Sequence, residues 1–203
     1  MQIDRIEPFD KTKYHIYIDG RLAFVLYKGE LRRLNLREGM EISDEIYKLI
    51  NEDILPKRAM KRCMFLLDKR DYTEYELRGK LIRAYYPTAA IDYAIDKLRM
   101  CGFIDDMRYA ERYFVYKSGT KSIRRIKNDL IGKGIDRSVI DAAYDQASGK
   151  GELGDEDELI HRLLVKRHYY EHDITAAEYA KQRNYLLSKG FSYDSVNRAL
   201  HLT

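Results

Sequence analysis

The sequence predicts a mainly α-helical protein of tandem three-helix repeats, preceded by a small segment that contains a β-hairpin. Three observations support this fold class. After Ser43 the apolar residues recur with the 3.6-residue period of amphipathic helices. One spacing of apolar residues occurs three times along this helical part, as in repeat architectures. Before Ser43, two runs of β-prone residues flank an Asp-Gly pair, which is a strong hairpin signal.

Composition excludes several classes of protein. The chain has 203 residues, of which 45% are apolar and 34% charged, with a net charge of +4. It has no apolar run near the ~20 residues of a membrane span and no apolar signal region at the N-terminus, so we expect a soluble, cytoplasmic protein. The cysteines, Cys63 and Cys101, form no CxxC pair, and we expect both to be small, buried apolar residues.

The first fifty residues have the pattern of a small sheet. Residues 14–18 alternate like a half-buried strand, and residues 21–26 form its hairpin partner across Asp19-Gly20. Further strands are expected near residues 2–8 and 40–42. Between them, residues 31–36 have the pattern of one or two helical turns.

Helix starts and apolar faces follow from Ser43 onward. Ser43 is an N-cap followed by two acids, which oppose the positive end of the helix dipole. Thr73 and Glu76 form a capping box. Four stripes mark the faces that we expect to be buried: Met60, Cys63, Met64 and Leu67; Ile91, Ala94, Ile95 and Leu98; Ile140, Ala143, Tyr144 and Ala147; and Val196, Ala199, Leu200 and Thr203.

The repeat is defined by a leucine with apolar residues 10 and 13 positions after it. In the second and third copies a Lys-Gly-apolar turn follows the leucine, at residues 133–135 and 189–191, and glycine suits the left-handed position after a helix end. The first copy has Tyr85-Tyr86-Pro87 there, so we expect the proline to end that helix. The copies are Leu81, Ile91 and Ala94; Leu130, Ile140 and Ala143; and Leu186, Val196 and Ala199.

We expect four segments: a β-rich segment over residues 1–50 and helical repeats over residues 51–105, 106–150 and 151–203. One such unit cannot bury its apolar face alone, so three in a row predict an elongated, curved array with a concave surface. The stretch over residues 147–158 holds three glycines and five acids, a composition typical of a flexible or solvated linker.

The sequence contains no nucleophile elbow, phosphate-binding loop or dinucleotide-binding motif. We therefore expect a protein that is not an enzyme and needs no cofactor. One of the paired carboxylates Asp105 and Asp106 is better explained as an N-cap than as an acid–base group or metal ligand. His168 and His172 are four residues apart but have no cysteine or second cluster nearby, so we expect a solvated face there and no metal site.

Basic residues recur at helical spacing in each repeat. Between Lys117 and Lys133 there are six bases and one acid. Such a stripe can be a solvated helix face, but stripes that recur along a repeat array are also what an extended anionic partner selects. The stripes are Arg58, Lys61 and Arg62; Lys121, Arg124 and Arg125; and Arg162, Lys166 and Arg167.

The chain has eighteen tyrosines and no tryptophan. Tyr109, Tyr113 and Tyr116 share one helical stripe among basic residues. Core packing explains such a stripe, and the alternatives are a protein interface, where Tyr and Arg are favoured anchors, or stacking on single-stranded bases. Because so many tyrosines cannot all be buried, we expect a partner surface.

Four segments resemble the motifs of the RecX family of regulatory proteins. Residues 67–81 match L-xx-R-xx-[ST]-xx-EL-xx-KL, and residues 102–110 match G-[FYL]-[IL]-[DN]-D-xx-[FY]-A. Residues 126–135 and 186–191 are similar to the later repeat turns of the family. The chain departs from the pattern at Tyr85-Tyr86-Pro87 and in its N-terminal β segment, which shorter members lack.

The resemblance implies a non-enzymatic modulator of the RecA recombinase that acts in DNA repair, recombination and the SOS response. In the family, the curved module lodges in the groove of the RecA–single-stranded DNA filament, limits its growth or promotes its disassembly, and lowers ATP hydrolysis, strand exchange and co-protease activity. We expect a monomer that contacts RecA, with single-stranded DNA in the filament or weak direct DNA binding as a further contact, and no membrane. Charge and exposed spacing alone select the expected partner-binding residues: Arg70, Lys121, Arg124, Arg125 and Lys127.

Two other functions are consistent with the residues. Three short helices with a glycine turn resemble a helix-turn-helix module, which would bind DNA independently of a recombinase. Against this, no single helix concentrates the Arg, Asn and Gln used in base readout. A scaffold of tyrosine-rich repeats, in contrast, would bind a protein and be indifferent to DNA.

Overall fold

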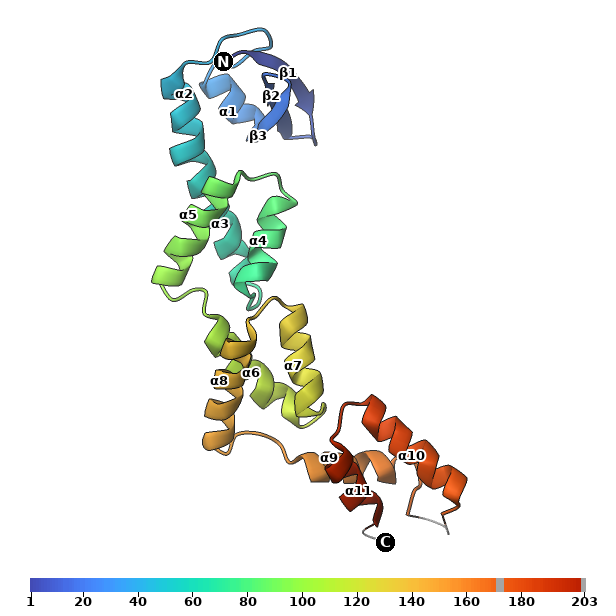
Figure 1. The fold of residues 1–203 in the computed structure, drawn as a ribbon. Helices are drawn as coiled ribbons and strands as arrows, with labels where there is room; N and C mark the ends of the chain where they lie inside the picture. The colour runs from blue at the N-terminus through green and yellow to red at the C-terminus, as the bar shows by residue number, and fades with distance from the viewer. Residues whose placement is uncertain (171–173, 202–203) are drawn as a thin grey trace. The chain divides into compact units, whose positions relative to one another are not determined.

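The computed structural model describes residues 1–170 and 174–201, in two compact units of residues 1–104 and 105–203 (Figure 1). The chain is mainly helical, with a three-stranded antiparallel sheet at its N-terminal end and three-helix repeats after it. The predicted fold class is confirmed. The sheet segment and each repeat bury an apolar cluster of their own. Within the described residues, no helix is both long enough and apolar enough to cross a membrane.

The N-terminal segment is a sheet in the order β1-β2-β3. Asp19 and Gly20, at φ 49° and 74°, join β2 to β3 through the left-handed backbone that a two-residue hairpin requires, so the predicted hairpin is confirmed. The helical turns expected at residues 31–36 begin at Lys28 instead. The elements are β1 (Ile3–Pro8), β2 (Lys13–Ile18), β3 (Arg21–Tyr27) and α1 (Lys28–Arg33).

The short strand predicted at residues 40–42 is wrong. This segment forms an isolated bridge, between Gln2 and Glu41. Just before it, Gly39 has φ 75°, and just after it Ser43 already caps the next helix. The segment still makes backbone hydrogen bonds to the start of β1, from Ile3 N to the carbonyl of Met40 and from Ile42 N to the carbonyl of Met1, but they are too few to form a strand.

A continuous helical run leads from the sheet segment into repeat 1. It consists of α2 (Asp44–Lys48), the π-helical turn η1 (Leu49–Ile54) and α3 (Leu55–Leu67). Ser43 caps its start as predicted. The predicted stripe in α3 is only partly right, because Cys63 is buried while Met64 is 44% exposed. The small side chains of Ala59 and Cys63 let α3 pack closely against the helix α5 (Thr88–Met100), and this contact selects the buried face.

The repeated spacing marks the cores of the repeats. All nine residues of the three copies are buried, and the capping box of Thr73 and Glu76 is present at the start of α4. Thr203 lies outside the described residues. Repeat 1 consists of α3, α4 (Glu74–Ile82) and α5 (Thr88–Met100); repeat 2 of α6 (Asp106–Ser118), α7 (Ile123–Gly132) and α8 (Arg137–Gly149); and repeat 3 of α9 (Glu156–Val165), α10 (Ala176–Ser188) and α11 (Tyr193–His201).

The turns after the repeat leucines use a left-handed residue in all three copies. Gly134 and Gly190 have φ 80° and 93°, as predicted. The expectation that Pro87 ends the first helix is wrong, because Tyr85 itself takes φ 61° and completes the same turn. A left-handed conformation costs a residue with a Cβ roughly 1–2 kcal/mol, so this position needs compensation.

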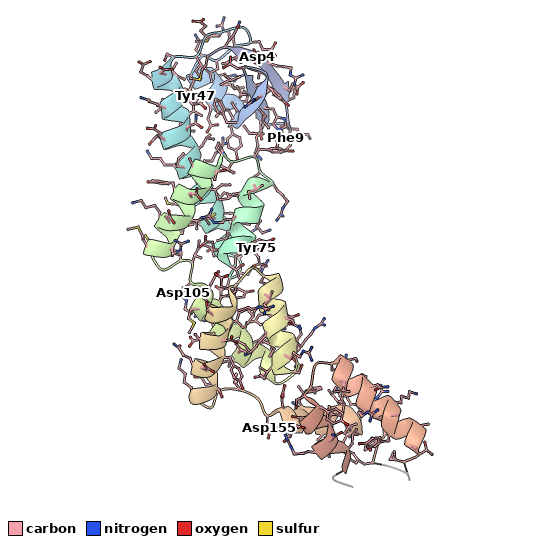
Figure 2. The ribbon with its side chains drawn as sticks, in the orientation of Figure 1. Asp4, Phe9, Tyr47, Tyr75, Asp105 and Asp155 are labelled. Carbon is pink, nitrogen blue, oxygen red and sulfur yellow. The ribbon has the colours of Figure 1, made fainter. Side chains whose placement is uncertain are left out.

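The ring of Tyr85 supplies that compensation by packing against the sheet segment. Its centroid lies 5.4 Å from the ring of Phe9 and 5.0 Å from that of His15, both edge-on. In Figure 2, Phe9 lies at the end of the sheet that faces repeat 1. Aromatic pairs of this kind contribute about 1 kcal/mol each, enough to offset the backbone strain.

Arg58 of α3 makes the second set of contacts between repeat 1 and the sheet segment. Its Nη1 donates to Glu30 Oε2 at 2.7 Å, and its Nη2 donates to the carbonyl of Val25. The guanidinium lies 4.9 Å and 5.3 Å from the ring centroids of Tyr27 and Tyr86. One half-buried cation therefore joins α3 to both β3 and α1.

The linker predicted over residues 147–158 is shorter than expected and is bonded to repeat 2, although most of its residues are exposed to solvent as predicted. Helix α8 continues through Ala147, which is 1% exposed, to Gly149. Gly154 N donates to Ser118 Oγ at 2.8 Å, and a Cβ on Gly154 would lie 3.0 Å from Gly119 N. Composition could not reveal this, because a glycine used for close approach looks the same in sequence as one used for flexibility.

The domain boundaries stay a prediction. The boundary at residue 50 falls inside η1, the one at residue 105 lies just before α6, and the one at residue 150 lies just after α8.

The two cysteines differ, so the prediction that both are buried is wrong for Cys101, which is exposed. Burial raises the pKa of the Cys63 thiol to about 11. At pH 8 we expect one thiol per native chain to react with dithionitrobenzoate, and Cys63 to react roughly a hundredfold more slowly. Native Cys101→Ser should show no fast phase, and a fast phase in that variant would contradict the burial of Cys63.

Candidate partner-binding surface

Four of the five predicted residues gather on α7 or just before it. Helix α7 is capped by Ser122, whose Oγ accepts a hydrogen bond from Arg125 N, and Lys121 precedes this cap. The apolar residues of α7 face the core of repeat 2, so helical spacing turns Arg124 and Arg125 toward solvent and leaves Lys127 half-buried. The predicted basic stripe is therefore a real surface feature of repeat 2.

Asp129 is the acid that organises this face. It accepts hydrogen bonds at Oδ2 from Lys121 Nζ and, at 3.2 Å, from Tyr113 OH, and Arg125 Nε lies 3.7 Å from its Oδ1. Burial raises the pKa of Asp129, but the hydrogen bond from Lys121 outweighs it and the pKa is lowered. The same hydrogen bond raises the pKa of Lys121.

The remaining cations differ in their exposure and in whether they already pair with an acidic side chain. The side chain of Arg125 is 62% exposed. Arg124 is exposed and has no ion-pair partner among the described residues. Lys127 Nζ lies 2.7 Å from Asp141 Oδ1 and 4.7 Å from the ring centroid of Tyr144. Arg124 and Arg125 are thus the cations of α7 most open to a partner.

Arg70, the fifth predicted residue, lies in the other compact unit, after α3. Its guanidinium lies 3.7 Å from the ring centroid of Tyr72, and Nη2 is 3.7 Å from Glu76 Oε1. The side chain is half exposed. Arg70 therefore offers a stacked, exposed cation, separate from the group on α7.

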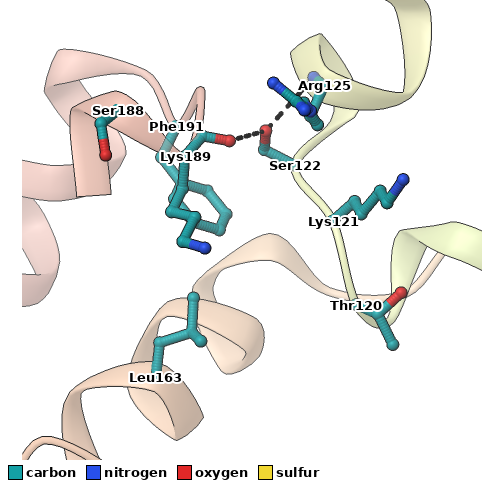
Figure 3. Close-up of a pocket in the computed structure, with 8 residues that line it drawn as sticks. All are labelled: Thr120, Lys121, Ser122, Arg125, Leu163, Ser188, Lys189 and Phe191. Atoms are coloured by element: carbon teal, nitrogen blue, oxygen red, sulfur yellow. Dashed lines mark hydrogen bonds between the residues drawn. The ribbon is translucent and has the colours of Figure 1, made fainter. Parts of the chain in front are cut away.

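A pocket lies beside α7 at the junction of repeats 2 and 3 (Figure 3). Its volume is about 390 Å³. Sequence reasoning missed the pocket and Lys189, which it assigned only to a repeat turn. The lining consists of the cations Lys121, Arg125 and Lys189, the hydroxyl residues Thr120, Ser122 and Ser188, and the apolar residues Leu163 and Phe191.

The two walls of the pocket are joined by hydrogen bonds. Ser122 Oγ donates to the carbonyl of Lys189 at 2.8 Å (Figure 3), and Ile123 N donates to Glu156 Oε1 at 2.7 Å. Gly190 lies against the same serine, so closely that a Cβ there would be 2.8 Å from Ser122 Oγ. The glycine of the repeat 3 turn therefore serves the junction as well as the turn.

The tyrosine stripe of α6 is only partly core. Tyr109 and Tyr113 stack with ring centroids 6.2 Å apart, and Lys133 Nζ lies 5.5 Å from the centroid of Tyr109. Tyr116 is 76% exposed. The expectation that the tyrosines are not all buried is confirmed, since Tyr75 is also 62% exposed.

Asp105 accepts a hydrogen bond from Arg108 N at 2.9 Å and caps α6, which confirms the N-cap interpretation of the acidic pair. Figure 2 shows Asp105 and Asp155 at the starts of their helices. In the part of the chain that the structure describes, no three His, Cys, Asp or Glu residues are grouped as for a metal ion. His172 lies outside the described residues.

The Asp129–Lys121 pair predicts a pH dependence. Because the pKa of Asp129 is lowered on folding, the pair stabilises the folded chain above about pH 4 and is lost as the pH falls further. We expect Asp129→Asn to reduce stability by about 1 kcal/mol at pH 7 and by clearly less at pH 3, as the pH falls through the lowered pKa of Asp129. Urea unfolding at both pH values measures this, and an equal loss at pH 3 would contradict the role of the charge.

Three family descriptions match the helical part of the chain in order. The first, second and third three-helix domains of RecX match residues 59–98, 105–143 and 155–200. Regulatory protein RecX of Caldanaerobacter subterraneus subsp. tengcongensis is 29% identical over 206 residues, with both chains covered completely. Regulatory protein RecX of Finegoldia magna is 30% identical, with 96% of each chain covered.

Solved structures agree with these sequence matches. A crystal structure of regulatory protein RecX is similar to this chain with a TM-score of 0.65 and 28% identity, over 98% of each chain. The crystal structure of RecX from Lactobacillus salivarius has a TM-score of 0.62 and 28% identity, and covers 73% of this chain and 98% of its own.

Proposed function

Because this chain belongs to the RecX family of regulatory proteins, we propose that it regulates the RecA recombinase and does so without catalysing a reaction. It binds the RecA–single-stranded DNA filament in the cytoplasm and limits filament growth, ATP hydrolysis and strand exchange. DNA repair and recombination are modulated as a consequence.

The observation that carries the proposal is the cationic face of α7 beside the pocket. Arg124 and Arg125 are exposed there, and Lys189 adds a cation from repeat 3. A surface of this kind suits a partner that presents negative charge over a long distance, as a filament of protein and DNA does. Arg70 and Tyr72, in the other unit, offer a second contact of the same chemistry.

The test is the ATPase rate of the host RecA on single-stranded DNA. Adding this protein at less than one copy per RecA protomer should lower the rate, because capping or disassembling a filament affects many protomers at once. The inhibition should weaken as salt is raised, since the proposed contacts are ionic. An unchanged rate, with filaments confirmed by electron microscopy, would overturn the proposal.

Charge reversal locates the contact. We expect Arg124→Glu combined with Arg125→Glu to raise the half-inhibitory concentration about tenfold or more, because unlike charges become like charges. The matched control reverses Arg32 and Arg33, an adjacent exposed pair on α1, and should change it less than about threefold. Equal losses in both variants would show a general charge effect and contradict a role for α7.

One observation favours a second candidate, direct binding of duplex DNA. Arg124, Lys127 and Asn128 share one side of α7 and line a second pocket of about 480 Å³. Arg and Asn are residues that read base edges. Tight, salt-dependent binding of duplex DNA without RecA, lost in Asn128→Ala and Arg124→Ala, would support this candidate. If those two variants still inhibited RecA, duplex DNA binding would be a function separate from RecA regulation.

A further inference from the structure

We propose that the pocket between repeats 2 and 3 binds an acidic side chain of a protein partner together with an apolar side chain beside it in the same segment. The inference rests on the proposed function in one respect, that a protein partner exists. It adds the place on this chain where a protein segment docks and the chemistry of that segment.

The charge of the pocket favours a carboxylate. Among the residues that the structure describes, the lining has three cations and no acid. Lys121 is already bonded to Asp129, whereas Lys189 is exposed and has no ion-pair partner among the described residues. Arg125 Nε is 3.7 Å from Asp129, too far for a good hydrogen bond, so its guanidinium also retains donors. Two cations with donors to spare provide a charge-assisted site for one carboxylate.

The apolar part of the pocket favours a peptide. Leu163 of α9 and Phe191 after α10 lie on the repeat 3 side, while Lys121, Ser122 and Arg125 lie on the repeat 2 side (Figure 3). A segment with a carboxylate and a neighbouring apolar side chain can therefore meet both kinds of wall at once. Protein interfaces commonly combine an apolar centre with a polar rim in this way.

The same features argue against a nucleic-acid backbone as the occupant. A phosphate backbone is bound by cations spaced along an open track, with affinity that comes from many phosphates. Here the three cations line one pocket whose walls are joined by the hydrogen bond from Ser122 Oγ to the carbonyl of Lys189. The apolar wall, which is exposed chiefly at Leu163 because Phe191 is only 2% exposed, would gain nothing from a phosphate.

Nuclear magnetic resonance on the ¹⁵N-labelled full chain tests the proposal. The probes are the peptide Gly-Ser-Glu-Leu-Glu-Ser, the same peptide with Gln for both Glu, inorganic phosphate and a ten-nucleotide deoxythymidine oligomer. At about 5 mM, where weak contacts are populated, the acidic peptide should shift the amide signals of Ser122, Arg125 and Gly190. The Gln peptide should shift them at least fivefold less.

Variants give the matched comparison. Lys189→Gln should reduce the shifts caused by the acidic peptide at least threefold. Lys181→Gln changes an exposed lysine of α10, the helix that ends just before Lys189, and this lysine does not line the pocket; it should leave the shifts unchanged. The proposal is overturned if the acidic peptide shifts no signals at the pocket, if the Gln peptide is equivalent, or if phosphate or the oligomer produces the same shifts as the acidic peptide.

The RecA assay separates this inference from the proposed function. If the wild-type chain inhibits RecA and Lys189→Gln inhibits it equally, with no peptide shifts at the pocket, the docking site is wrong and the regulatory function stands. If the peptide shifts are present but the wild-type chain does not affect RecA, the docking site stands and its partner is a different protein.

Discussion

Gly190→Ala is expected to lower the free energy of unfolding by about 2–3 kcal/mol, although it adds a single methyl group. Alanine at φ 93° is strained, at a cost of roughly 1 kcal/mol or more. The new Cβ would also lie 2.8 Å from Ser122 Oγ, and relieving this overlap costs roughly a further 1–2 kcal/mol. Urea unfolding followed by circular dichroism measures the loss. Because the junction must shift, RecA inhibition should fall as well.

Gly151→Ala is the matched control for this substitution. Gly151 follows α8 at φ 69°, and nothing lies within 4 Å of a Cβ placed there. It should therefore show only the backbone cost, about 1 kcal/mol. Removing the Ser122 hydroxyl in Ser122→Ala should make the effect of Gly190→Ala smaller than in the wild-type chain. Equal losses in Gly190→Ala and Gly151→Ala would contradict a specific contact at the junction.

Arg58→Met is expected to destabilise the chain by about 2–4 kcal/mol. The substitution keeps most of the apolar stem but leaves the Glu30 carboxylate, which is 18% exposed, without its cation. It also removes the donor to the carbonyl of Val25. Leaving a partly buried charge without its partner costs far more folding free energy than an ion pair on the surface contributes. Chemical unfolding measures the loss, and proteolysis within the sheet segment should become faster because α3 no longer holds it.

Lys57 provides the control for Arg58. It is the preceding residue in α3, is 68% exposed and pairs with Asp53 one turn earlier. Lys57→Met should change the unfolding free energy by no more than about 0.5 kcal/mol, as is usual for an exposed pair. If both variants lowered the unfolding free energy equally, the contacts of Arg58 with β3 and α1 would not be what holds the sheet segment against repeat 1.

The sequence correctly predicted the elements that depend only on residues close together in the chain. The Asp19-Gly20 hairpin and the caps at Ser43 and Thr73 depend on a few neighbouring residues, and each is present. The spacing that begins at Leu81 and Leu130 also predicted buried positions, because helix geometry alone brings such residues onto one face.

The predictions that were wrong have other causes. Met64 was placed on a buried stripe and Cys101 in a core by their hydrophobicity, but both are exposed. Tyr85 was expected to yield the helix end to Pro87, yet its ring contacts in the sheet segment make a left-handed tyrosine tolerable. For Met64 and Tyr85, contacts between residues far apart in the sequence outweighed the local preference, whereas Cys101 is the exposed C-cap residue of α5.

The candidate site also has one part that the sequence predicted and another that only the tertiary structure revealed. Sequence alone identified the basic face of α7, because charge and helical spacing suffice to place Arg124 and Arg125 on the outside of an amphipathic helix. Only the tertiary structure brought Lys189 and Leu163 to that face and made a pocket. A pocket between repeats depends on how their surfaces approach each other. At this junction that approach is set by the missing Cβ of Gly190 and by the hydroxyl of Ser122, whose hydrogen-bond partner Lys189 is 67 residues away in the sequence. Residues so far apart have no common signal in the sequence.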